Sequence, residues 1–280
     1  MTTTRAWLVT GASKGFGKAL VEAIAKRGEP VAGTFRDANQ ARAFEQAYPG
    51  IATGVLLDVT DAAGIVRVVD HVLSRFGHLD VLVNNAGYGQ FGAVEDLSDQ
   101  QIRKLMDTNF FGLLNMTRAV LPHFRARRSG RIVNISSVAG FSAYGAGAAT
   151  YSASKFAVEG LSEAMALELA PLGIGITLVE PGSFRTEFGA ASMDMSAGES
   201  ADYAALLGPV RMYLQHKYHG TEPGDPVKAA QAILTALDAP EPPARLVLGA
   251  DAVSLVRKKL EVVAEQVNAW EKLSLGTGFD

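Results

Sequence analysis

The chain has 280 residues, of which 48% are hydrophobic and 20% are charged, and its formal net charge is -3. This length and mixture are typical of one large globular domain and exclude a fibrous or disordered chain. The nearly neutral charge gives no basic field for a nucleic-acid backbone, and the absence of cysteine excludes disulfides and thiolate sites.

We expect no export leader at the start of the chain and no membrane span within it. Strand-like residues begin at position 6, which leaves no room for a basic and apolar leader, and no later stretch is apolar for long enough to span a bilayer. The five histidines lack a metal-like spacing. We therefore expect a cytoplasmic protein with no metal, no nucleic-acid partner and no membrane partner.

Short apolar runs alternate with longer amphipathic stretches from one end of the chain to the other. This alternation is typical of βαβ units whose strands are buried on both faces of a parallel sheet. We expect strands at 6–10, 30–35, 54–58, 80–84, 131–136, 174–180 and 245–248, and helices at 18–26, 38–47, 62–76, 99–127 and 151–169. The pattern predicts an α/β fold, a doubly wound parallel sheet of about seven strands with helices on both faces.

Two segments fall outside this alternation. At about 184–220 there is no clear strand, and glycines separate a set of large apolar side chains, which predicts an apolar substrate lid. A helical hairpin that packs on the sheet remains the alternative for this segment. At about 252–273 the apolar spacing predicts an amphipathic C-terminal helix.

A glycine-rich turn follows the first expected strand and precedes the first expected helix. Gly11, Gly15 and Gly17 are spaced Gly-x-x-x-Gly-x-Gly, a variation on the usual dinucleotide fingerprint. Such glycines permit a tight turn, the approach of a pyrophosphate to backbone, and close packing of the helix on the strand. The turn therefore predicts a seat for a nucleotide at the start of the helix.

The end of the second expected strand indicates which dinucleotide binds. An acidic residue usually stands there to bind the adenosine ribose, but this chain has Phe35 and Arg36. A guanidinium pairs well with a ribose 2′-phosphate, and Lys14 in the glycine turn adds a second cation. We therefore expect NADP(H) in preference to NAD(H).

A phenol and an ammonium group lie one helical turn apart at Tyr151 and Lys155. A carbonyl that receives a hydride becomes an alkoxide, so its site needs a hydrogen-bond donor and a proton. Tyr151 can supply both, and the cation of Lys155 lowers the cost of the phenolate. The pair predicts general acid and base catalysis at a carbonyl.

With these residues the chain resembles the classical short-chain dehydrogenase/reductase (SDR) family from about residue 5 to about residue 250. The remaining motifs that carry the resemblance are Asp58-Val59, Asn84-Asn85-Ala86-Gly87, Asn109, Ser136-Ser137, and Pro181-Gly182 with Thr186. The resemblance implies a single Rossmann-type domain over residues 1–280 and nicotinamide-dependent redox chemistry. It also implies a homodimer or homotetramer.

The resemblance assigns roles to individual positions. Asp58 is expected at the adenine, the segment 181–186 along the nicotinamide, and Lys155 at the nicotinamide ribose. Asn109 resembles the residue that anchors a proton-relaying water. The resulting cofactor set is Gly11, Ser13, Lys14, Gly15, Phe16, Gly17, Arg36, Asp58, Val59, Asn85, Ala86, Gly87, Tyr151, Lys155, Pro181, Gly182 and Thr186.

Structural explanations exist for several of these positions. Asp58 can be a helix cap, and the Asn-rich turn can be chosen for its left-handed backbone.

Ser137 precedes Tyr151 by fourteen residues, where its hydroxyl can be a second donor to the substrate oxygen. Ser136 is the alternative, and the family's placement of its serine favours Ser137. The predicted catalytic group is Asn109, Ser137, Tyr151 and Lys155.

Aromatic residues follow two of the expected strands, on the side where ligands enter an open α/β sheet. The predicted substrate contacts are Tyr88, Phe91, Phe141, Tyr144 and Phe188. These side chains favour a hydrophobic ketone or aldehyde, or the corresponding alcohol. Two alternatives remain: a 3-oxoacyl-carrier-protein reductase with a basic docking patch at 125–131, and a catalytically silent NADP(H)-sensing protein of the same fold.

Overall fold

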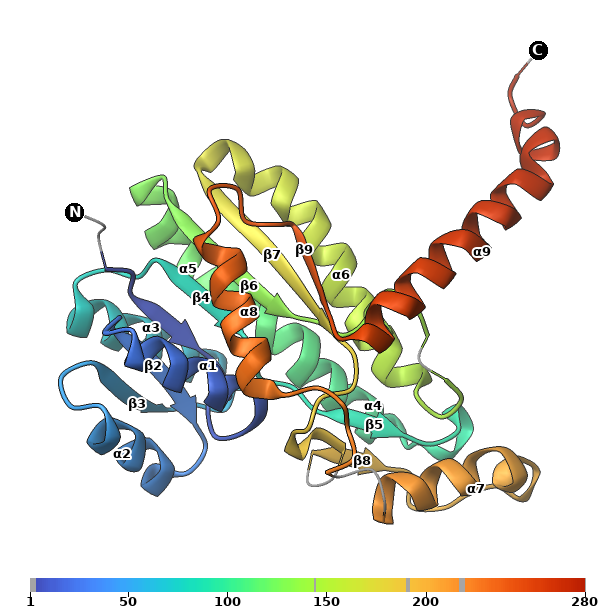
Figure 1. Ribbon diagram of the computed structural model, residues 1–280, viewed down its shortest axis with the longest axis horizontal. Coiled ribbons are helices and arrows are strands. Elements are labelled where there is room, and N and C mark those ends of the chain that lie inside the picture. Colours follow the sequence, from blue (N-terminus) through green and yellow to red (C-terminus); the bar gives the residue numbers. More distant parts are fainter. Residues whose placement is uncertain (1–3, 144, 190–191, 217–219, 280) are drawn as a thin grey trace.

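The computed structural model describes residues 4–143, 145–189, 192–216 and 220–279. Its centre is a parallel sheet of seven strands in the order β3-β2-β1-β4-β6-β7-β9 (Figure 1). The strands are β1 (Trp7–Val9), β2 (Val31–Phe35), β3 (Ala52–Leu56), β4 (Val81–Asn84), β6 (Gly130–Ile135), β7 (Ile174–Pro181) and β9 (Arg245–Leu248). The predicted parallel α/β sheet is thereby confirmed.

Helices cover both faces of the sheet. They are α1 (Gly15–Lys26), α2 (Ala38–Ala47), α3 (Ala62–Phe76), α4 (Asp99–Met106), α5 (Leu113–Arg127), α6 (Ala149–Leu169), α7 (Ala201–His216), α8 (Pro226–Asp238) and α9 (Ala250–Leu275). Apolar residues of α1 and α8 form a core with one face, and those of α3, α5 and α6 form a core with the other (Figure 1).

The alternation of side chains along each strand produces these two cores. In β1, Trp7 and Val9 belong to the core beneath α1, whereas Leu8 belongs to the core beneath α3 and α5. All three are fully buried. A strand between two helical layers buries both of its faces, which is why the strands consist mostly of consecutive apolar residues in the sequence.

Apart from small shifts at the ends of elements, the structure departs from the prediction at several points. The third strand begins at Ala52 instead of residue 54, so Asp58 lies in the loop after it. The predicted helix 99–127 contains a π-helical turn, Asp107–Gly112, between α4 and α5. α8 was not predicted, although Asp225 caps it and Pro226 occupies its first turn, both ordinary signals of a helix start.

The chain order of the strands reverses direction beside β1. β2 and β3 lie on one side of β1, and the chain then crosses to the other side to form β4. In such sheets the crevice at the carboxyl ends of the strands beside the reversal is where ligands bind. No helix in the described part of the chain is both long and apolar enough to cross a membrane.

A small second sheet lies beyond these carboxyl ends. Its strands β5 (Gly89–Phe91) and β8 (Met193–Met195) pair in parallel. β8 and α7 both belong to the segment 184–220, for which no strand was expected. A strand of three residues has too little periodicity to be recognised in a sequence, and its partner lies about a hundred residues away in the chain.

Candidate active site

The turn between β1 and α1 presents bare backbone at the start of a helix. Gly11 and Gly15 have φ angles of 68° and 55°, in the left-handed region that favours glycine. Gly17 is needed for another reason, because a Cβ atom there would lie 2.3 Å from the carbonyl oxygen of Gly11. The first turn of α1 therefore packs directly against the backbone of the preceding loop.

The N-terminus of α1 borders a cavity of about 970 Å³. Ser13, Lys14, Gly15 and Phe16 line the cavity, and no side chain of the described residues caps the helix at Lys14. Because a helix N-terminus carries a partial positive charge and unpaired N–H groups, it attracts anions. The turn thus offers backbone donors, a cation and free volume at one place.

The Asn-rich turn after β4 holds the glycine turn in position. The Asn85 amide nitrogen Nδ2 donates hydrogen bonds to the carbonyl oxygens of Thr10 and Gly11, at 2.9 and 3.0 Å. The hydroxyl of Thr10 accepts from the backbone N–H groups of Asn85 and Ala86. These bonds give the turn a structural function, in addition to its contribution to the cavity wall.

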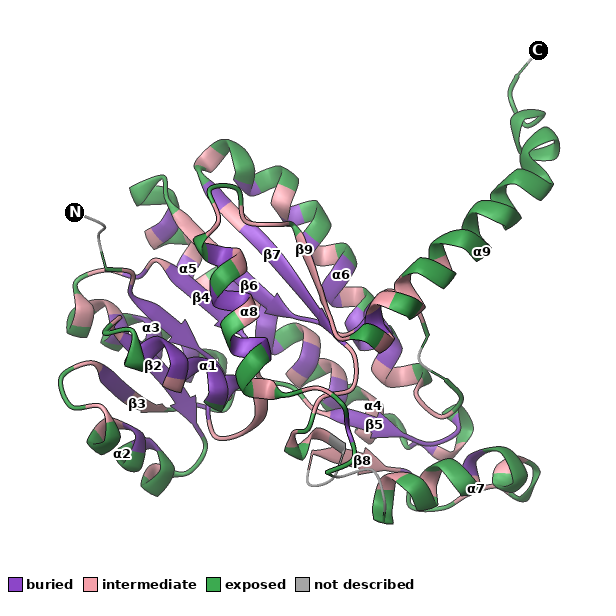
Figure 2. Ribbon diagram, viewed as in Figure 1, coloured by how far each residue is buried: buried purple, intermediate pink, exposed green. Residues whose placement is uncertain are grey.

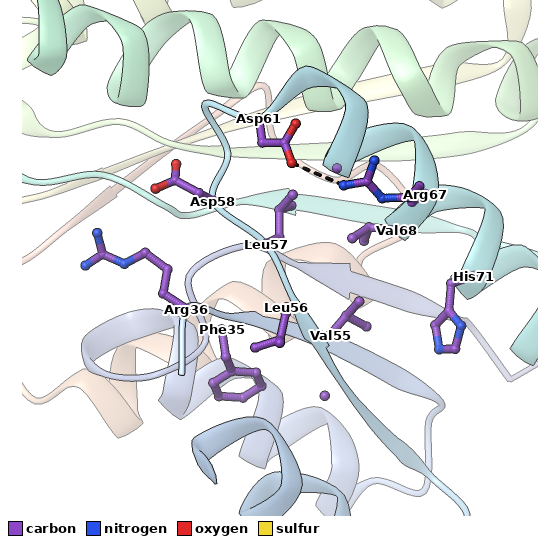
Figure 3. Close-up of a pocket in the computed structure, with 12 residues that line it drawn as sticks. Phe35, Arg36, Val55, Leu56, Leu57, Asp58, Asp61, Arg67, Val68 and His71 are labelled. Carbon is purple, nitrogen blue, oxygen red and sulfur yellow. Dashed lines mark hydrogen bonds and ion pairs between the residues drawn. The ribbon is translucent and has the colours of Figure 1, made fainter. Parts of the chain in front are cut away.

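Arg36 and Asp58 border both the cavity and a neighbouring pocket of about 700 Å³ (Figure 3). Asp58 is not a helix cap; it accepts hydrogen bonds from the N–H and hydroxyl of Thr60. Burial alone would raise the pKa of Asp58, but these bonds and the charges of Arg36 and Lys104 lower it overall. A carboxylate and a guanidinium therefore lie at the same end of the cavity.

The segment after β7 closes another side of the cavity. Asp251 at the start of α9 accepts a hydrogen bond from the Ser183 N–H at 2.7 Å, which fixes this segment. Phe184 packs edge-on against Phe16 with ring centres 5.0 Å apart. Among the predicted cofactor-binding residues, only Gly17 does not line the cavity; Pro181, Gly182, Thr186 and the others do.

Tyr151 and Lys155 lie one turn apart on α6, and both line the cavity. Lys155 is buried, and its Nζ atom donates a hydrogen bond to the carbonyl oxygen of Ile135 at 2.9 Å. The same Nζ atom lies 5.9 Å from the centre of the Tyr151 ring. The end of β6 therefore fixes the ammonium group next to the phenol, where its charge stabilises a phenolate.

Asn109 lies in the π-helical turn, and its side chain joins three elements. Its Oδ1 atom accepts from the Tyr88 N–H, and its Nδ2 atom donates to the Tyr88 carbonyl and the Ser154 hydroxyl, all within 3.1 Å. A Cβ at Gly87 would lie 3.0 Å from Asn109 Oδ1 and 3.7 Å from Lys155 Nζ. π-helical turns often occur at functional sites because they redirect a side chain.

Both serines of the Ser-Ser pair line the cavity at the end of β6. The Ser137 hydroxyl accepts a hydrogen bond from the Ala139 N–H at 3.1 Å, so its own proton remains available for donation. The Ser136 hydroxyl is buried and has no hydrogen-bond partner among the described residues. Both hydroxyl protons are therefore available to a ligand, and the choice of Ser137 over Ser136 stays a prediction.

The predicted substrate contacts divide into three groups. Tyr88, Phe91 and Phe188 line the cavity, and the Phe188 ring lies 5.4 Å from that of Tyr151. Phe141 does not belong to the cavity lining in the described part of the chain, because its ring packs against the guanidinium of Arg245, at 5.4 Å. The prediction for Phe141 is corrected accordingly, and Tyr144 lies outside the described residues.

A polar network at the lid side of the cavity was not predicted. Asp194 of β8 accepts hydrogen bonds from the side-chain amides of Gln90 and Gln101, at 3.0 to 3.3 Å. Burial and the charges of Asp194 and Asp107 raise the pKa of Tyr88 to about 12. The single acid between Met193 and Met195 was the only sequence signal of this network. The network attaches the segment 184–220 to β5 and α4.

Another part of the cavity wall is apolar. Leu206, Val210 and Leu214 of α7 face the cavity at the helical spacing of four residues. The predicted lid segment therefore contributes both the apolar wall and Asp194. Its function as a lid remains a proposal.

The buried ammonium of Lys155 generates a prediction about stability. Burial lowers its pKa to about 8, although the negative charge of Glu159 opposes part of this shift. Since an unfolded lysine has a pKa of about 10.4, the charge destabilises the fold below pH 8, and this cost fades as the pH rises toward 10. We predict that Lys155→Met raises the free energy of unfolding of the cofactor-free protein at pH 7 by about 1–3 kcal/mol.

Denaturant titrations at pH 7 and pH 10 measure this effect, and the gain should nearly vanish at the higher pH. The matched control is Lys258→Met, because Lys258 is exposed on α9 and should change stability little at either pH. A Lys155→Met protein that loses stability equally at both pH values would contradict the assignment of a destabilising buried cation.

Comparison with known proteins identifies the family. Residues 5–197 match the family model described as short chain dehydrogenase. A crystal structure of a short-chain dehydrogenase from Streptomyces avermitilis is 45% identical, with a TM-score of 0.91 and coverage of 99% of this chain and 100% of that one. A 3-ketodihydrosphingosine reductase of Bacteroides thetaiotaomicron is 38% identical over 86% of this chain and 87% of that protein.

A more distant solved structure connects the fold with a nicotinamide cofactor. It is the 3-ketoacyl-(acyl-carrier-protein) reductase from Brucella melitensis complexed with NADH, which is 25% identical, with a TM-score of 0.71 and coverage of 87% of this chain and 96% of that one. The glycine turn, the Tyr151 and Lys155 pair, the sheet order and these matches agree. The chain belongs to the short-chain dehydrogenase/reductase family of oxidoreductases.

Proposed function

We propose that this chain is an NADPH-dependent carbonyl reductase, or alcohol dehydrogenase in the reverse direction, which acts on a hydrophobic ketone or aldehyde. The observation that carries the proposal is the placement of Tyr151, Lys155 and Ser137 on one cavity with the bare N-terminus of α1. The residues present fit a dinucleotide. The turn has no room for a side chain at Gly17, so bare backbone starts the helix, and Lys14 adds a positive charge for a phosphate.

The residues that line this cavity would hold a reduced nicotinamide, which would supply the hydride for the substrate carbon. Tyr151 donates its phenolic proton to the carbonyl oxygen, so the product is an alcohol and the side chain becomes a phenolate. Lys155 stabilises that phenolate by its charge, and Ser137 donates a second hydrogen bond to the oxygen as negative charge develops. Phe188 and Phe91 exclude water from the apolar side of the site.

The preference for NADPH is supported by the charges at the end of β2. Arg36 is exposed there and lines the cavity. Asp37, the next residue, accepts hydrogen bonds from the N–H groups of Asn39 and Gln40 as the cap of α2. Its carboxylate is therefore directed to the helix and not to a ribose. A phosphate on the ribose would therefore meet Arg36 and Lys14 without competition from Asp37.

The hydrophobic substrate is supported by the cavity wall and by one relative. α7 contributes three aliphatic residues, and the aromatic rings of Phe91 and Phe188 complete an apolar surface. The relative from Bacteroides thetaiotaomicron is named for reduction of a 3-keto group on a sphingoid chain. Tyr88 and Asp194 add a limited polar region to the same cavity.

The carrier-protein alternative receives less support from the placement of the basic run. Arg127 donates hydrogen bonds to the Leu79 carbonyl and to Asp80, and Arg128 donates to the Pro171 carbonyl. These arginines precede β6, whereas the cavity lies at the carboxyl ends of the strands. A carrier protein docked on them would sit at the opposite edge of the sheet from Tyr151.

The first test is turnover by Tyr151→Phe with NADPH and a panel of aliphatic ketones, aromatic ketones, aldehydes and a 3-oxoacyl thioester. We expect kcat to fall by about 10²–10⁴ because the proton donor is lost, while NADPH binding changes little. Cofactor absorbance measures turnover, and fluorescence titration measures binding. The control is Tyr48→Phe, which removes a phenol at the end of α2, away from the cavity.

The outcome of this panel separates the alternatives. Activity of Tyr151→Phe equal to that of the parent protein would overturn the catalytic role. Turnover of the 3-oxoacyl thioester alone would favour the carrier-protein reductase. Binding of NADPH with no turnover of any panel member would favour the silent sensor.

The second test concerns cofactor selection. Removal of a charge-assisted contact costs about 1.5–3 kcal/mol, so we expect Arg36→Ala to weaken NADPH binding by about 10- to 100-fold. NADH binding should change by less than about threefold, because no phosphate then faces the guanidinium. The control Arg42→Ala removes an exposed arginine of α2. Equal losses for both cofactors would contradict the assignment.

A further inference from the structure

The C-terminal helix α9 leaves the body of the protein after its first turns. Ala252 is buried, and Asp251 binds the Ser183 N–H, so the start of the helix is fixed to the sheet. Every residue from Leu260 to Leu275 is exposed. Figures 1 and 2 show this part of α9 extending away from the other elements, with solvent on all sides.

The exposed helix carries a continuous apolar seam. Its members are Val253, Val256, Leu260, Val263, Val267 and Trp270, spaced alternately three and four residues apart. Leu260, Val267 and Trp270 are 56%, 61% and 63% exposed. A repeat of 3.5 residues keeps such a seam on one side of a helix and is the sequence pattern of a coiled coil.

The exposed part of α9 gains little stability from packing, because Trp270 and Leu260 face solvent. Helical segments of about 12–15 residues are only marginally stable without packing of an apolar face. Exposed apolar patches of this kind usually mark interaction surfaces. The seam therefore requires a partner helix.

The charges of α9 indicate what that partner is. Arg257, Lys258 and Lys259 make the first part of the helix basic, and Glu261, Glu265 and Glu271 make the later part predominantly acidic. Two copies in parallel would place like charges side by side, whereas two antiparallel copies place the basic part of each against the acidic part of the other. A twofold axis produces this arrangement with one self-complementary surface.

We propose that the α9 seam binds the α9 seam of a second copy of this chain as an antiparallel coiled coil. The register that stacks Leu260 on Trp270 of the second copy also stacks Val263 on Val267, so it uses only seam residues that are clear of the body. The same register brings Arg257 next to Glu271 of the second copy. This interface is separate from any that the other helices form.

The first experiment measures the mass of the full-length protein in solution by light scattering and sedimentation. In the test variant, Leu260→Glu and Val267→Glu place two carboxylates on the seam. In the matched control, Val262→Glu and Ala269→Glu make the same chemical change on the outer face of α9. All four positions are exposed, so folding and NADPH binding should persist in both proteins.

We expect the test variant to assemble to a lower order than the parent protein, and the control to match the parent. A parent protein that is monomeric at micromolar concentration would overturn the proposal. A test variant with the mass of the parent would overturn it too, because the assembly would then use another surface. Neither result depends on whether the chain reduces a carbonyl.

The second experiment tests the antiparallel direction with reversed charges. Arg257→Glu and Glu271→Arg should each weaken the assembly several-fold, because each places like charges together. The two changes combined should restore the parent dissociation constant, because they recreate the pair with its signs exchanged. A double variant as weak as the sum of the single variants would contradict the antiparallel register.

Discussion

The position of Lys155 is the constraint on which the proposed chemistry depends. An ammonium group is held inside the protein by α6, with the carbonyl of Ile135 as its acceptor and the ring of Tyr151 beside it. Burial lowers the pKa of this group to about 8, so the protein keeps a cation where a cation is unfavourable. A buried cation that costs the fold stability is typical of a functional site, where the charge serves the chemistry and not the stability of the protein.

A charge cluster lies next to Lys155 and includes Glu159, whose negative charge acts on the ammonium group. Glu159 lies one turn further along α6 and, with Glu180 of β7, accepts hydrogen bonds from Arg245 of β9. Burial and the neighbouring Glu159 raise the pKa of Glu180 to about 7, although Arg245 opposes this. The cluster joins β7, β9 and α6. Since Phe141 packs on Arg245, that ring belongs to this cluster and not to the substrate wall.

The sequence was sufficient for features that depend on neighbouring residues. The glycine turn, the apolar strands and the Tyr151 and Lys155 pair are local patterns, and each lies where the pattern predicts. Contacts between distant segments were not predictable in this way. Asp194 meets Gln90 because β8 pairs with β5 across about a hundred residues of chain, and Phe141 faces Arg245 for a similar reason. Nothing in the local composition of these segments specifies those partners.

The most direct measurement is a crystal structure of the protein with NADPH and a slowly reduced hydrophobic ketone. We predict that the Tyr151 hydroxyl donates a hydrogen bond to the ketone oxygen. The reactive carbon of the nicotinamide ring should lie about 3–3.5 Å from the ketone carbon. The phosphate of the adenosine ribose should contact Arg36. A nicotinamide bound in the cavity with the ketone oxygen turned away from Tyr151 would contradict the account.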